Sequence, residues 1–503
     1  MAERRVLSCS AKLQPFFHNG RAKVKRTAAF YITTWGVEML NTIKYRMLAL
    51  FVATLCCTNV LAALPVIPGA AGFGMNTPAG RGGKIIRVTN LNDSGQGSLR
   101  ACVTASGPRV CIFEVSGTIR LESKLIVSNP YLTVAGQTAP APGVMLRGFS
   151  FVISASNVLV QHLAVRVGDD PNGQTTGSRD SLKINNYARD VVVDHCSLSW
   201  ALDENIETWK HWDNVTISNT IISEALAASS DGKAVHSYGA LIHSESETSK
   251  ISFIGNLFAH NHARNPRSNA GRFVFVNNVV YNPAAAAVML FNADGLTSEN
   301  SIFGNVFIDG RNTAAALKPI RLNGSGASDG NEILAGTRLY LADNLASSAT
   351  SDPWSIVDNQ STISLISVAL LSAPPWPDAL KALKGNTVLD HVLKNSGSRP
   401  AQRNSVDARV IADVKKGSGQ IINCVASDGT SECMKNAGGW PILPNNSRRL
   451  DVPSNPNADD DGDGYTNMEE WLHAMSAEVE GGSTLDQPGE PAPPRPPTLQ
   501  TSP

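Results

Sequence analysis

The sequence predicts an all-β protein: a right-handed parallel β-helix with an irregular C-terminal extension. Similar strand-like segments of alternating apolar residues recur from about residue 157, and each ends in a polar residue. The chain has 41 glycines and few long apolar runs, which is typical of many short strands joined by turns. The number of residues between equivalent positions of these segments then distinguishes a solenoid from other all-β folds.

The repeated segments read NVLVQHLAV, DVVVDHCSL, NVTISNTII, KISFIGNLF, RFVFVNNVV, NSIFGNVFI and RLYLADNLA. Aligned on the polar residue, they place one residue each at an equivalent corner: His162, His195, Asn219, Asn256, Asn278, Asn305 and Asn344. The spacings are 33, 24, 37, 22, 27 and 39 residues, so loops are inserted into a shorter base period, as in a solenoid of stacked coils. Asparagines at one corner can form a ladder of amide hydrogen bonds. A β-sandwich or a propeller is the alternative, although propeller blades repeat at longer periods.

The N-terminal residues 1–62 are predicted to be a leader and an export signal. They hold nine Lys or Arg and two acidic residues, and they end in a basic segment followed by MLALFVATLCCTNVLAA. A basic region, an apolar region and small residues at Ala62 and Ala63 are the pattern of a cleaved signal. A membrane anchor is the alternative, but the apolar run is short for a span. We therefore expect a secreted protein, extracellular or periplasmic, without a membrane contact after cleavage.

The remaining chain divides into four parts. Residues 63–350 are assigned to the β-helix, which opens with strands in KIIRVTNL, VCIFEVSGTIRL and KLIVS and a short helix capped by Ser98. Residues 351–450 are an extension that packs on it, with helix-like stretches in WPDALKALKGNTVLDHVLKN and an irregular lid or return segment after them. Residues 451–480 form a calcium loop and a helix, and the Pro-rich composition of 481–503 indicates a disordered tail.

Five cysteines remain after signal cleavage. Two pairs, Cys102 with Cys111 and Cys424 with Cys433, each enclose eight residues and suit local disulfides in an oxidising compartment. Cys196 is left over inside a strand-like segment, and we expect it to be a buried packing thiol.

The charge is unevenly distributed. The formal net charge is zero, but without residues 1–62 the chain has 34 basic and 41 acidic residues. A net charge of −7 does not fit a general nucleic-acid binder, which needs a basic footprint. A polyanion would bind only where a local basic patch or bound cations overcome this background. We expect a monomer with no nucleic-acid partner.

Acidic residues gather in and between the strand-like segments VVVDH and NVTIS. They are Asp194, Asp203, Glu204 and Glu207, with Asp180 shortly upstream. Clustered carboxylates on a sheet surface favour a hard cation, and a solvated acidic loop is the alternative. Downstream, one strand leads into HARNPR. In a parallel solenoid with a rise of ~5 Å per coil, its arginines fall about two coils from the acids; a surface Arg-Pro turn is the alternative.

A second cation site is indicated by spacing alone. The segment DDDGDGYTNMEE has the ligand positions of a twelve-residue EF-hand loop. The predicted ligands are Asp459, Asp461, Asp463, Tyr465 through its carbonyl, Asn467 and Glu470. PSNPNA precedes the loop, so no entering helix is expected, and the segment resembles the half-hand calcium loops of secreted bacterial enzymes. We expect a structural role, with a solvated acidic turn as the alternative.

Taken together, the motifs resemble the pectate lyases of polysaccharide lyase family 1, in their bacterial type. The resemblance rests on RDSLKI, VVVDHCSLSW, DENIE before DNVTIS, and ARNPR. The opening PGAAGFGMNTPAGRGGKIIRVTNLNDSGQGSLRACV and VSGTIRL add to it. It covers roughly residues 66–345, and more loosely the chain to Pro444.

The resemblance implies roles for individual residues. It implies Ca²⁺ as cofactor, a catalytic position at Arg264, a structural Asp194-His195 pair, and Ca²⁺ ligands at Asp180, Asp203 and Glu207. Two positions depart from the family pattern: Asn269 stands where a second arginine is expected, and Tyr238 where a substrate-binding lysine is expected. The substrate-binding candidates are therefore Arg267, Lys233, His236 and Tyr238.

The implied activity is a secreted, Ca²⁺-dependent pectate lyase that acts on polyuronate. Removing the C5 proton next to a carboxylate needs a cation to stabilise the enediolate charge and a base facing C5. A guanidinium normally stays protonated, so Arg264 would need a lowered pKa to act as that base. The alternatives are a polygalacturonase-like hydrolase, which needs a pair of carboxyl groups, and a non-catalytic carbohydrate-binding β-helix. Aromatic platforms at Trp200, Trp209 or Trp212 could serve either a lyase or a binding protein.

Overall fold

The computed structural model describes six stretches of the chain: residues 64–174, 178–227, 236–324, 331–361, 369–425 and 437–481. The predicted leader, Lys233, Cys433 and the tail from residue 482 lie outside them. Within these stretches, no helix is both long and apolar enough to cross a membrane.

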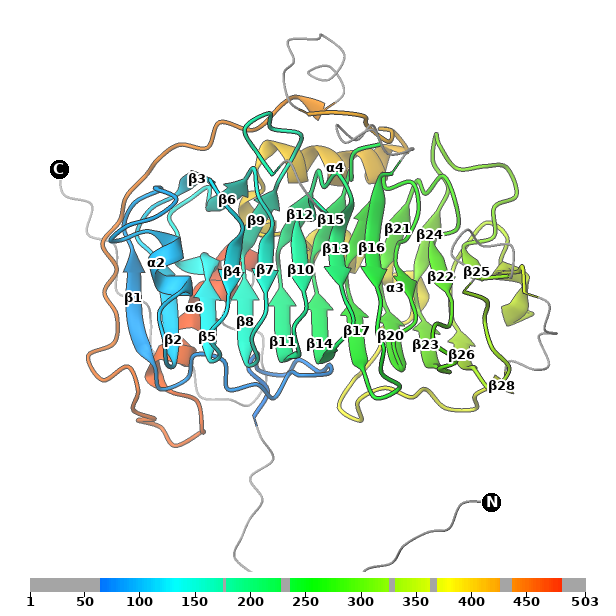
Figure 1. Ribbon diagram of the computed structural model, residues 1–503, viewed down its shortest axis with the longest axis horizontal. Helices are drawn as coiled ribbons and strands as arrows, with labels where there is room; N and C mark the ends of the chain where they lie inside the picture. Colours follow the sequence, from blue (N-terminus) through cyan, green and yellow to red (C-terminus); the bar gives the residue numbers. More distant parts are fainter. Residues whose placement is uncertain are drawn as a thin grey trace, which may run out of the picture. The chain divides into compact units, whose positions relative to one another are not determined.

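The described strands form three sheets in which neighbouring strands pair in parallel, so the fold is the predicted parallel β-helix (Figure 1). From β2 to β25 each coil contributes one strand to each sheet in turn, and such crossovers between parallel strands are nearly always right-handed. Sheet 1 contains β1 (Lys84–Val88), β2 (Arg109–Phe113), β5 (Leu132–Ala135), β8 (Val158–Gln161), β11 (Ala188–Asp194), β14 (Trp212–Ser218), β17 (Lys250–Ile254), β20 (Arg272–Val276), β23 (Glu299–Phe303), β26 (Arg338–Ala342) and β28 (Ala369–Leu370).

Sheet 2 follows sheet 1 along each coil, and sheet 3 follows sheet 2. Sheet 2 contains β3 (Gly117–Arg120), β6 (Val144–Arg147), β9 (Leu163–Arg166), β12 (Ser197–Ser199), β15 (Ile221–Ser223), β18 (Leu257–Ala259), β21 (Val279–Tyr281) and β24 (Val306–Ile308). Sheet 3 contains β4 (Leu125–Val127), β7 (Phe151–Ile153), β10 (Leu182–Ile184), β13 (Glu204–Thr208), β16 (Tyr238–Ile242), β19 (Arg267–Ser268), β22 (Val288–Leu290), β25 (Ile320–Leu322) and β27 (Val357–Asn359).

The core runs along the inside of the coils. Alternate residues of each strand point inward, and strand register stacks equivalent side chains of successive coils on one another. Phe253, Phe273 and Phe275 are fully buried, and their ring centroids lie 6.0 to 6.4 Å apart. Each buried phenylalanine contributes about 1.5–3 kcal/mol relative to an exposed one, so this stack stabilises the middle coils.

The predicted asparagine ladder is present over four coils. The side-chain amide of Asn256 donates to Asn278, that of Asn278 to Asn305, and that of Asn305 to Asn344, over 2.9 to 3.1 Å. The first three residues of our alignment do not belong to this ladder, and here the alignment was wrong by one position. His162, His195 and Asn219 occupy the preceding residue, which has a positive φ of 46° to 57°. In later coils that corner holds Gly255, Asn277, Gly304 or Asp343.

The physical reason for the shift is that both corner positions accept asparagine. The left-handed position favours Gly, Asn or Asp, and the next position needs an amide that can reach the neighbouring coil. Because Asn219 satisfies the first requirement and Asn256 the second, the two residues looked equivalent in the sequence.

The C-terminal part wraps back along the β-helix (Figure 1). Two of its helices, α3 (Gly385–Asn395) and α4 (Ser405–Lys416), place apolar residues against strands of sheet 2. The third, α6 (Asn467–Glu480), packs on the first strands of sheet 1. The second half of the predicted helix-like stretch is α3, whereas the residues before 385 are not helical; α4 lies within the segment that we expected to be irregular.

Smaller elements complete the described chain. The predicted short helix is α2 (Leu99–Val103), and Ser98 caps it by accepting from the Ala101 amide. Three short 3₁₀ turns are η1 (Gly136–Thr138), η2 (Pro353–Ile356) and η4 (Pro400–Gln402).

The cysteines follow the prediction where they are described. Cys102 and Cys111 form a disulfide that joins α2 to β2, with Cα atoms 5.9 Å apart. Cys196 is a buried free thiol, and burial raises its pKa to about 12, so it is chemically inert. Cys424 is disulfide-bonded, and its predicted partner, Cys433, lies outside the described residues.

Candidate active site

A cluster of carboxylates, two of them buried and one partly buried, lies where sheet 2 turns into sheet 3. Asp180 stands two residues before β10, Asp203 directly before β13, and Glu204 is the first residue of β13. Because β10 and β13 pair in parallel, these positions stack in neighbouring coils. One carboxylate oxygen from each of the three residues lies within 4.8 Å of the others. We call these three residues the acidic cluster.

Glu207, the third ligand expected from the resemblance, forms an ion pair and is not part of the acidic cluster. Glu207 lies next to Lys183 across the β10–β13 pair and forms an ion pair with its ammonium group. The same ammonium lies 3.9 Å from Asp180. Glu207 is therefore beside the acidic cluster, neutralised by Lys183.

The sequence places Glu204 among the clustered acids without marking it as a ligand, and it gives Lys183 no role. The motif assigns ligands at Asp203 and Glu207 and leaves Glu204, which lies between them, without a role. The available signal for Glu204 was its position directly after Asp203. The contact of Lys183 with Glu207 depends on strand register, because 24 residues separate them.

The electrostatics of the acidic cluster favour a bound cation. Burial raises the pKa of Asp180 well above its usual range, and the nearby Glu207 and Glu204 charges raise it further. Burial also raises the pKa of Glu204 to about 8; Arg264 opposes this shift, while Asp203 adds to it. Buried carboxylates this close together stabilise positive charge between them.

The donor set also fits Ca²⁺. Asp180 Oδ2 is buried and accepts no hydrogen bond in the described structure. A buried oxygen without a donor, next to two further carboxylates, is a suitable ligand for a hard cation.

Arg264 reaches the acidic cluster from two coils away, as the sequence predicted. It follows Ala263, which pairs with Tyr238 of β16, and β16 pairs in turn with β13. Its backbone has a positive φ of 55°. The guanidinium lies 4.0 Å above the Tyr238 ring centre and forms an ion pair with Glu204. The tyrosine ring and the carboxylate together fix the guanidinium above the cluster.

Arg267 lies on the outward-facing row of sheet 3. Register places Glu207, Leu241 and Arg267 side by side on successive strands. The Arg267 guanidinium lies 4.2 Å from the ring centre of Phe291. Arg267 is therefore two strands beyond Glu207 on the same surface.

Two further substrate-binding candidates contact the cluster. His236 Nε2 lies 3.3 Å from Asp203 Oδ1, and its ring centre is 4.9 Å from that of Tyr238. Tyr238 supports Arg264 from below, as described above. Lys233 lies outside the described residues.

Of the three tryptophans considered as platforms, only Trp209 is available. Trp200 and Trp212 are buried, whereas Trp209 is 39% exposed. The Trp209 ring lies 4.5 Å from His243, which fixes its orientation beside the outward row.

The Asp194-His195 pair belongs to the scaffold, as expected. Asp194 is buried and accepts from His195 at 2.8 Å, from Ser218 at 2.7 Å and from Asn219 at 3.1 Å. Burial alone would raise the pKa of Asp194, but His195 outweighs it and holds that pKa well below its usual range. With its carboxylate saturated by donors, Asp194 is not available as a metal ligand.

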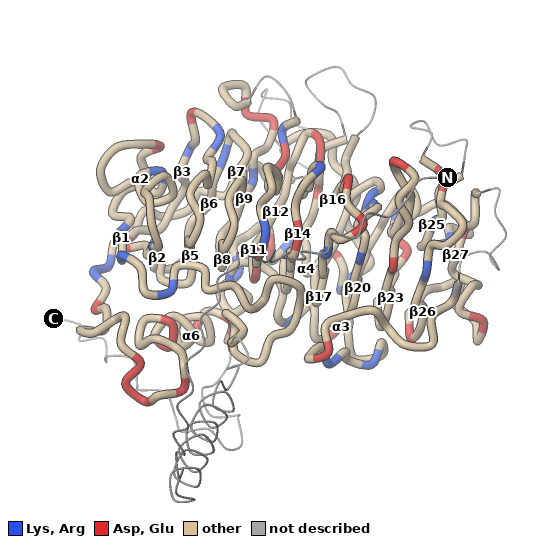
Figure 2. The backbone as a smooth tube through the Cα atoms, turned by 60° about the horizontal axis from the view of Figure 1, so that its bottom comes forward, with Lys and Arg blue, Asp and Glu red and all other residues tan. Residues whose placement is uncertain are grey.

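The second predicted cation site lies in the loop before α6, where Figure 2 shows acidic residues close together. Single oxygens of Asp459, Asp461 and Asp463 lie within 4.8 Å of one another. Burial raises the pKa of Glu470, and the neighbouring Asp461 and Asp463 raise it further. These acids therefore lie close together in the loop, as the predicted ligand spacing requires.

The remaining residues of this loop make other contacts. No helix precedes the loop between residues 451 and 466, and α6 follows it directly. The Asn467 amide donates to Asp460 at 2.8 Å, and the Tyr465 hydroxyl donates to the Pro65 carbonyl at 2.8 Å.

Comparison with known proteins gives no matching family model. Among curated proteins, the chain is 30% identical over 444 residues to "Probable pectate lyase C" of Aspergillus terreus, covering 85% of this chain and 98% of that protein. The protein of the same name from Aspergillus flavus is 29% identical over 448 residues, covering 86% and 98%. The one from Emericella nidulans is 36% identical over 253 residues, covering 50% and 55%.

Similar solved structures include a pectate lyase bound to hexasaccharide, with a TM-score of 0.46, 14% identity, and coverage of 68% of this chain and 99% of that one. The major allergen from cedar pollen has a TM-score of 0.40 and 17% identity, covering 64% and 91%. These structures are too distant to assign a family. The Aspergillus proteins, in contrast, match over nearly their whole length.

Proposed function

The chain belongs to the pectate lyase family and is therefore a polysaccharide lyase, and we propose that it cleaves de-esterified polygalacturonate by Ca²⁺-assisted β-elimination. The observation that supports this reaction is the meeting of the largely buried acidic cluster with Arg264 from two coils away. The products would be oligogalacturonides with a 4,5-unsaturated end.

Ca²⁺ would be held by Asp180, Asp203 and Glu204, with Glu207 beside them. When bound, the ion supplies a positive charge that stabilises the enediolate formed next to the sugar carboxylate. The protein supplies a rigid set of buried oxygens whose mutual repulsion is relieved by a cation.

Arg264 is proposed to face C5 of the sugar. The base takes the C5 proton, the electron pair forms the C4–C5 double bond, and the glycosidic oxygen leaves C4 and gains a proton from solvent. Arg264 must first lose a proton, which costs about 1.4 kcal/mol for each pKa unit by which it must be lowered. Its ion pair with Glu204 fixes the guanidinium above the acidic cluster. Glu204 would thus serve both as a ligand of the cation and as the partner that holds the guanidinium beside it.

Substrate carboxylates are proposed to bind along the outward row of sheet 3. Arg267 lies on this row and has the planar fork that matches a carboxylate. His236 and Tyr238 lie at the cluster end, and Lys233 remains a candidate from the sequence. Trp209 offers an exposed ring on the same side for stacking of a sugar.

The experiment that tests the reaction is ultraviolet detection of unsaturated product from polygalacturonate, with and without a chelator. We expect absorbance to rise with Ca²⁺ and to stop when the chelator is added. New reducing ends without unsaturation would support the hydrolase instead, and binding without any cleavage would support the carbohydrate-binding β-helix.

The loop before α6 is proposed as a second, structural Ca²⁺ site with ligands Asp459, Asp461, Asp463, Tyr465, Asn467 and Glu470. The convergence of three aspartates supports it. Asn467 would have to leave its contact with Asp460 or act through water.

The domain division and the cellular location also remain proposals. We propose export through residues 1–62, a β-helix over 63–350, an extension over 351–450, the calcium segment at 451–480 and a tail from 481. The sheets themselves continue beyond residue 350 through β27 and β28. We further propose that the enzyme is a secreted monomer.

A further inference from the structure

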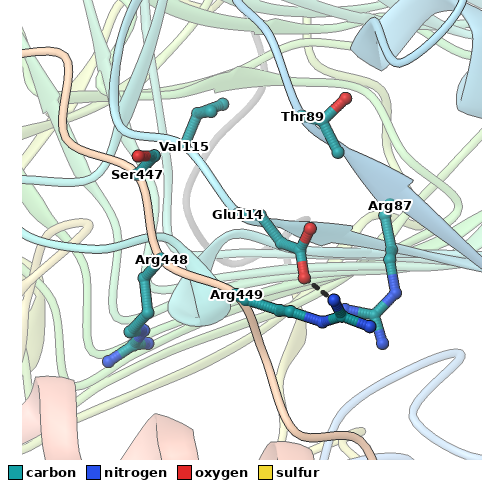
Figure 3. Close-up of a pocket in the computed structure, with 7 residues that line it drawn as sticks. All are labelled: Arg87, Thr89, Glu114, Val115, Ser447, Arg448 and Arg449. Atoms are coloured by element: carbon teal, nitrogen blue, oxygen red, sulfur yellow. Dashed lines mark hydrogen bonds and ion pairs between the residues drawn. The ribbon is translucent and has the colours of Figure 1, made fainter.

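A polar pocket lies at the turn from sheet 1 into sheet 2, in the first coils of the β-helix. Its cavity has a volume of about 330 Å³ and lies between the ends of β1 and β2 and the returning segment 446–450. Figure 3 shows the residues around it, which include Arg87, Thr89, Glu114, Ser447, Arg448 and Arg449. Nothing in the proposed lyase reaction uses this pocket.

The pocket is built on a fixed backbone. The Ser116 amide donates to the Asn446 carbonyl at 2.9 Å, and the Arg448 amide donates to the Glu114 carbonyl at 2.8 Å. Val115 and Ser447 pair as an antiparallel bridge. Two segments that are more than 300 residues apart in the sequence are thus locked together, so the pocket is largely preorganised for a ligand.

The pocket has an excess of positive charge. Arg87 forms an ion pair with Glu114, and the Leu450 amide also donates to that carboxylate at 2.9 Å. Within the described residues, the Arg449 guanidinium makes neither an ion pair nor a hydrogen bond. Figure 3 shows its side chain extending on the side of Glu114 and Arg87, whereas Arg448 extends to the other side. One guanidinium is therefore left to bind an anion.

The pocket is separate from the acidic cluster. It lies at the turn from sheet 1 to sheet 2 near β1 and β2, whereas the cluster lies at the turn from sheet 2 to sheet 3 near β10 and β13. Outside residues 1–62 the chain has a net charge of −7, so a polyanion needs local positive patches to bind. The pocket offers such a patch several coils away from the proposed cleavage site.

We propose that this pocket binds a carboxylate of the polyuronate chain and anchors the polymer remotely from the cleavage site. This proposal rests on the proposed lyase function. The Arg449 fork suits a carboxylate bidentately, and the hydroxyls of Thr89 and Ser447 can bond to sugar oxygens. Free phosphate presents the same anionic oxygens and is the competing ligand.

The kinetic test compares a long and a short substrate. For Arg449→Gln we expect the KM for polygalacturonate to rise about tenfold, as for a lost charge-assisted hydrogen bond, with kcat unchanged. The KM for trigalacturonate should stay the same, because one molecule of this short substrate cannot reach from the cleavage site to the pocket, so its turnover does not depend on the anchor. Arg311→Gln is the matched control, since Arg311 is exposed and lies outside the pocket. An equal change for both substrates, or no change beyond that of the control, would overturn the proposal.

A binding test does not depend on turnover. Calorimetry in chelator compares trigalacturonate with inorganic phosphate on the wild-type protein, Arg449→Gln and Arg449→Lys. We expect the trigalacturonate heat to vanish in Arg449→Gln and to weaken in Arg449→Lys, which keeps the charge but loses the fork. Saturable binding of phosphate but not of trigalacturonate, or equal binding by all three proteins, would overturn it. If the wild-type protein binds trigalacturonate through Arg449 but releases no unsaturated product, the lyase function fails while the pocket stands.

Discussion

Arg264 is the residue on which the proposed chemistry depends most directly, because its guanidinium is fixed between the Tyr238 ring and the Glu204 carboxylate. Replacing it with alanine removes the proposed base, and general-base catalysis contributes about 10²–10⁴-fold. We expect Arg264→Ala to lower kcat by at least about a hundredfold, with an unchanged circular dichroism spectrum. Arg311→Ala serves as the control for loss of one exposed arginine, and normal turnover by Arg264→Ala would exclude it as the base.

Glu204 predicts a pH dependence of stability. Burial, together with Asp203 and against Arg264, raises its pKa from 4.5 to about 8. Because the pKa of Glu204 is higher in the folded than in the unfolded protein, the folded state keeps this proton more tightly. The resulting stabilisation is fully present below pH 4.5 and is lost as pH rises through about 8. In chelator, we expect Tm to fall over this window in wild-type protein, and to fall less in Glu204→Gln.

Calcium should reverse this dependence, because it binds the ionised carboxylates. The rise in Tm on adding Ca²⁺ should be larger at about pH 9 than at about pH 6. Glu122→Gln removes an exposed carboxylate and is the control. An identical pH profile for Glu204→Gln and wild type would show that Glu204 does not titrate in this window.

The sequence predicted the site residues that belong to a recognisable motif. It did not predict the contacts that depend on how the strands pair. Asp180, Asp203 and Arg264 were placed by motif, and they do meet or approach one another in space. The ion pair of Lys183 with Glu207 could not be foreseen, because it requires the pairing of two specific strands. Glu204 needed the same knowledge of where its strand begins.

The asparagine ladder is the element with the clearest energetic consequence. Asn278 is buried; its amide donates to Asn305 and to the Phe253 carbonyl, and its oxygen accepts from Asn256. Asn278→Ala leaves these buried groups unsatisfied, and each such group costs about 1–3 kcal/mol. We expect the unfolding free energy to fall by at least about this amount in urea titration. Gln96→Ala, at an exposed turn, is the control, and equal stability of the two variants would contradict the prediction.

The helix α4 has clear local sequence signals, but its position depends on distant contacts. Its apolar positions recur at helical spacing, Asn404 caps its start and Gly417 ends it in the left-handed conformation. These signals were readable, and the expectation of an irregular segment overlooked them. The contacts that place the helix were not readable: Asp407 accepts from Arg166 and from Ser197, each more than 200 residues away.

At the scale of the whole molecule, α6 and its loop connect the C-terminal end of the described chain to its first coils. Glu469 of α6 forms an ion pair with Arg81 at 2.9 Å, and Tyr465 binds the Pro65 carbonyl. The buried face of α6 packs on Val110 and Ile112 of β2. The parallel β-helix itself was predictable from a short-range pattern, but this closure joins residues about 400 positions apart.

Because of this closure, we expect the proposed loop Ca²⁺ site to affect stability and the proposed site at the acidic cluster to affect turnover. A ligand that binds only the folded protein stabilises it by about 2.7 kcal/mol at a concentration a hundred times its Kd. Asp463→Asn weakens the loop site, so we expect a lower Tm in Ca²⁺ than for wild type, while kcat at saturating Ca²⁺ is unchanged. Asp203→Asn should do the opposite: it should abolish turnover and keep the loop-dependent gain in Tm.

The control for both variants is Asp451→Asn, which removes one exposed carboxylate outside the loop. Scanning calorimetry in chelator and in Ca²⁺ gives the stability readout, and unsaturated product gives the activity readout. If Asp463→Asn loses turnover and stability together, the loop cannot be a purely structural site, because its effect would then reach the acidic cluster several coils away. If it loses neither, the convergent aspartates before α6 are a solvated acidic turn, and the contacts of Glu469 and Tyr465 alone hold the closure.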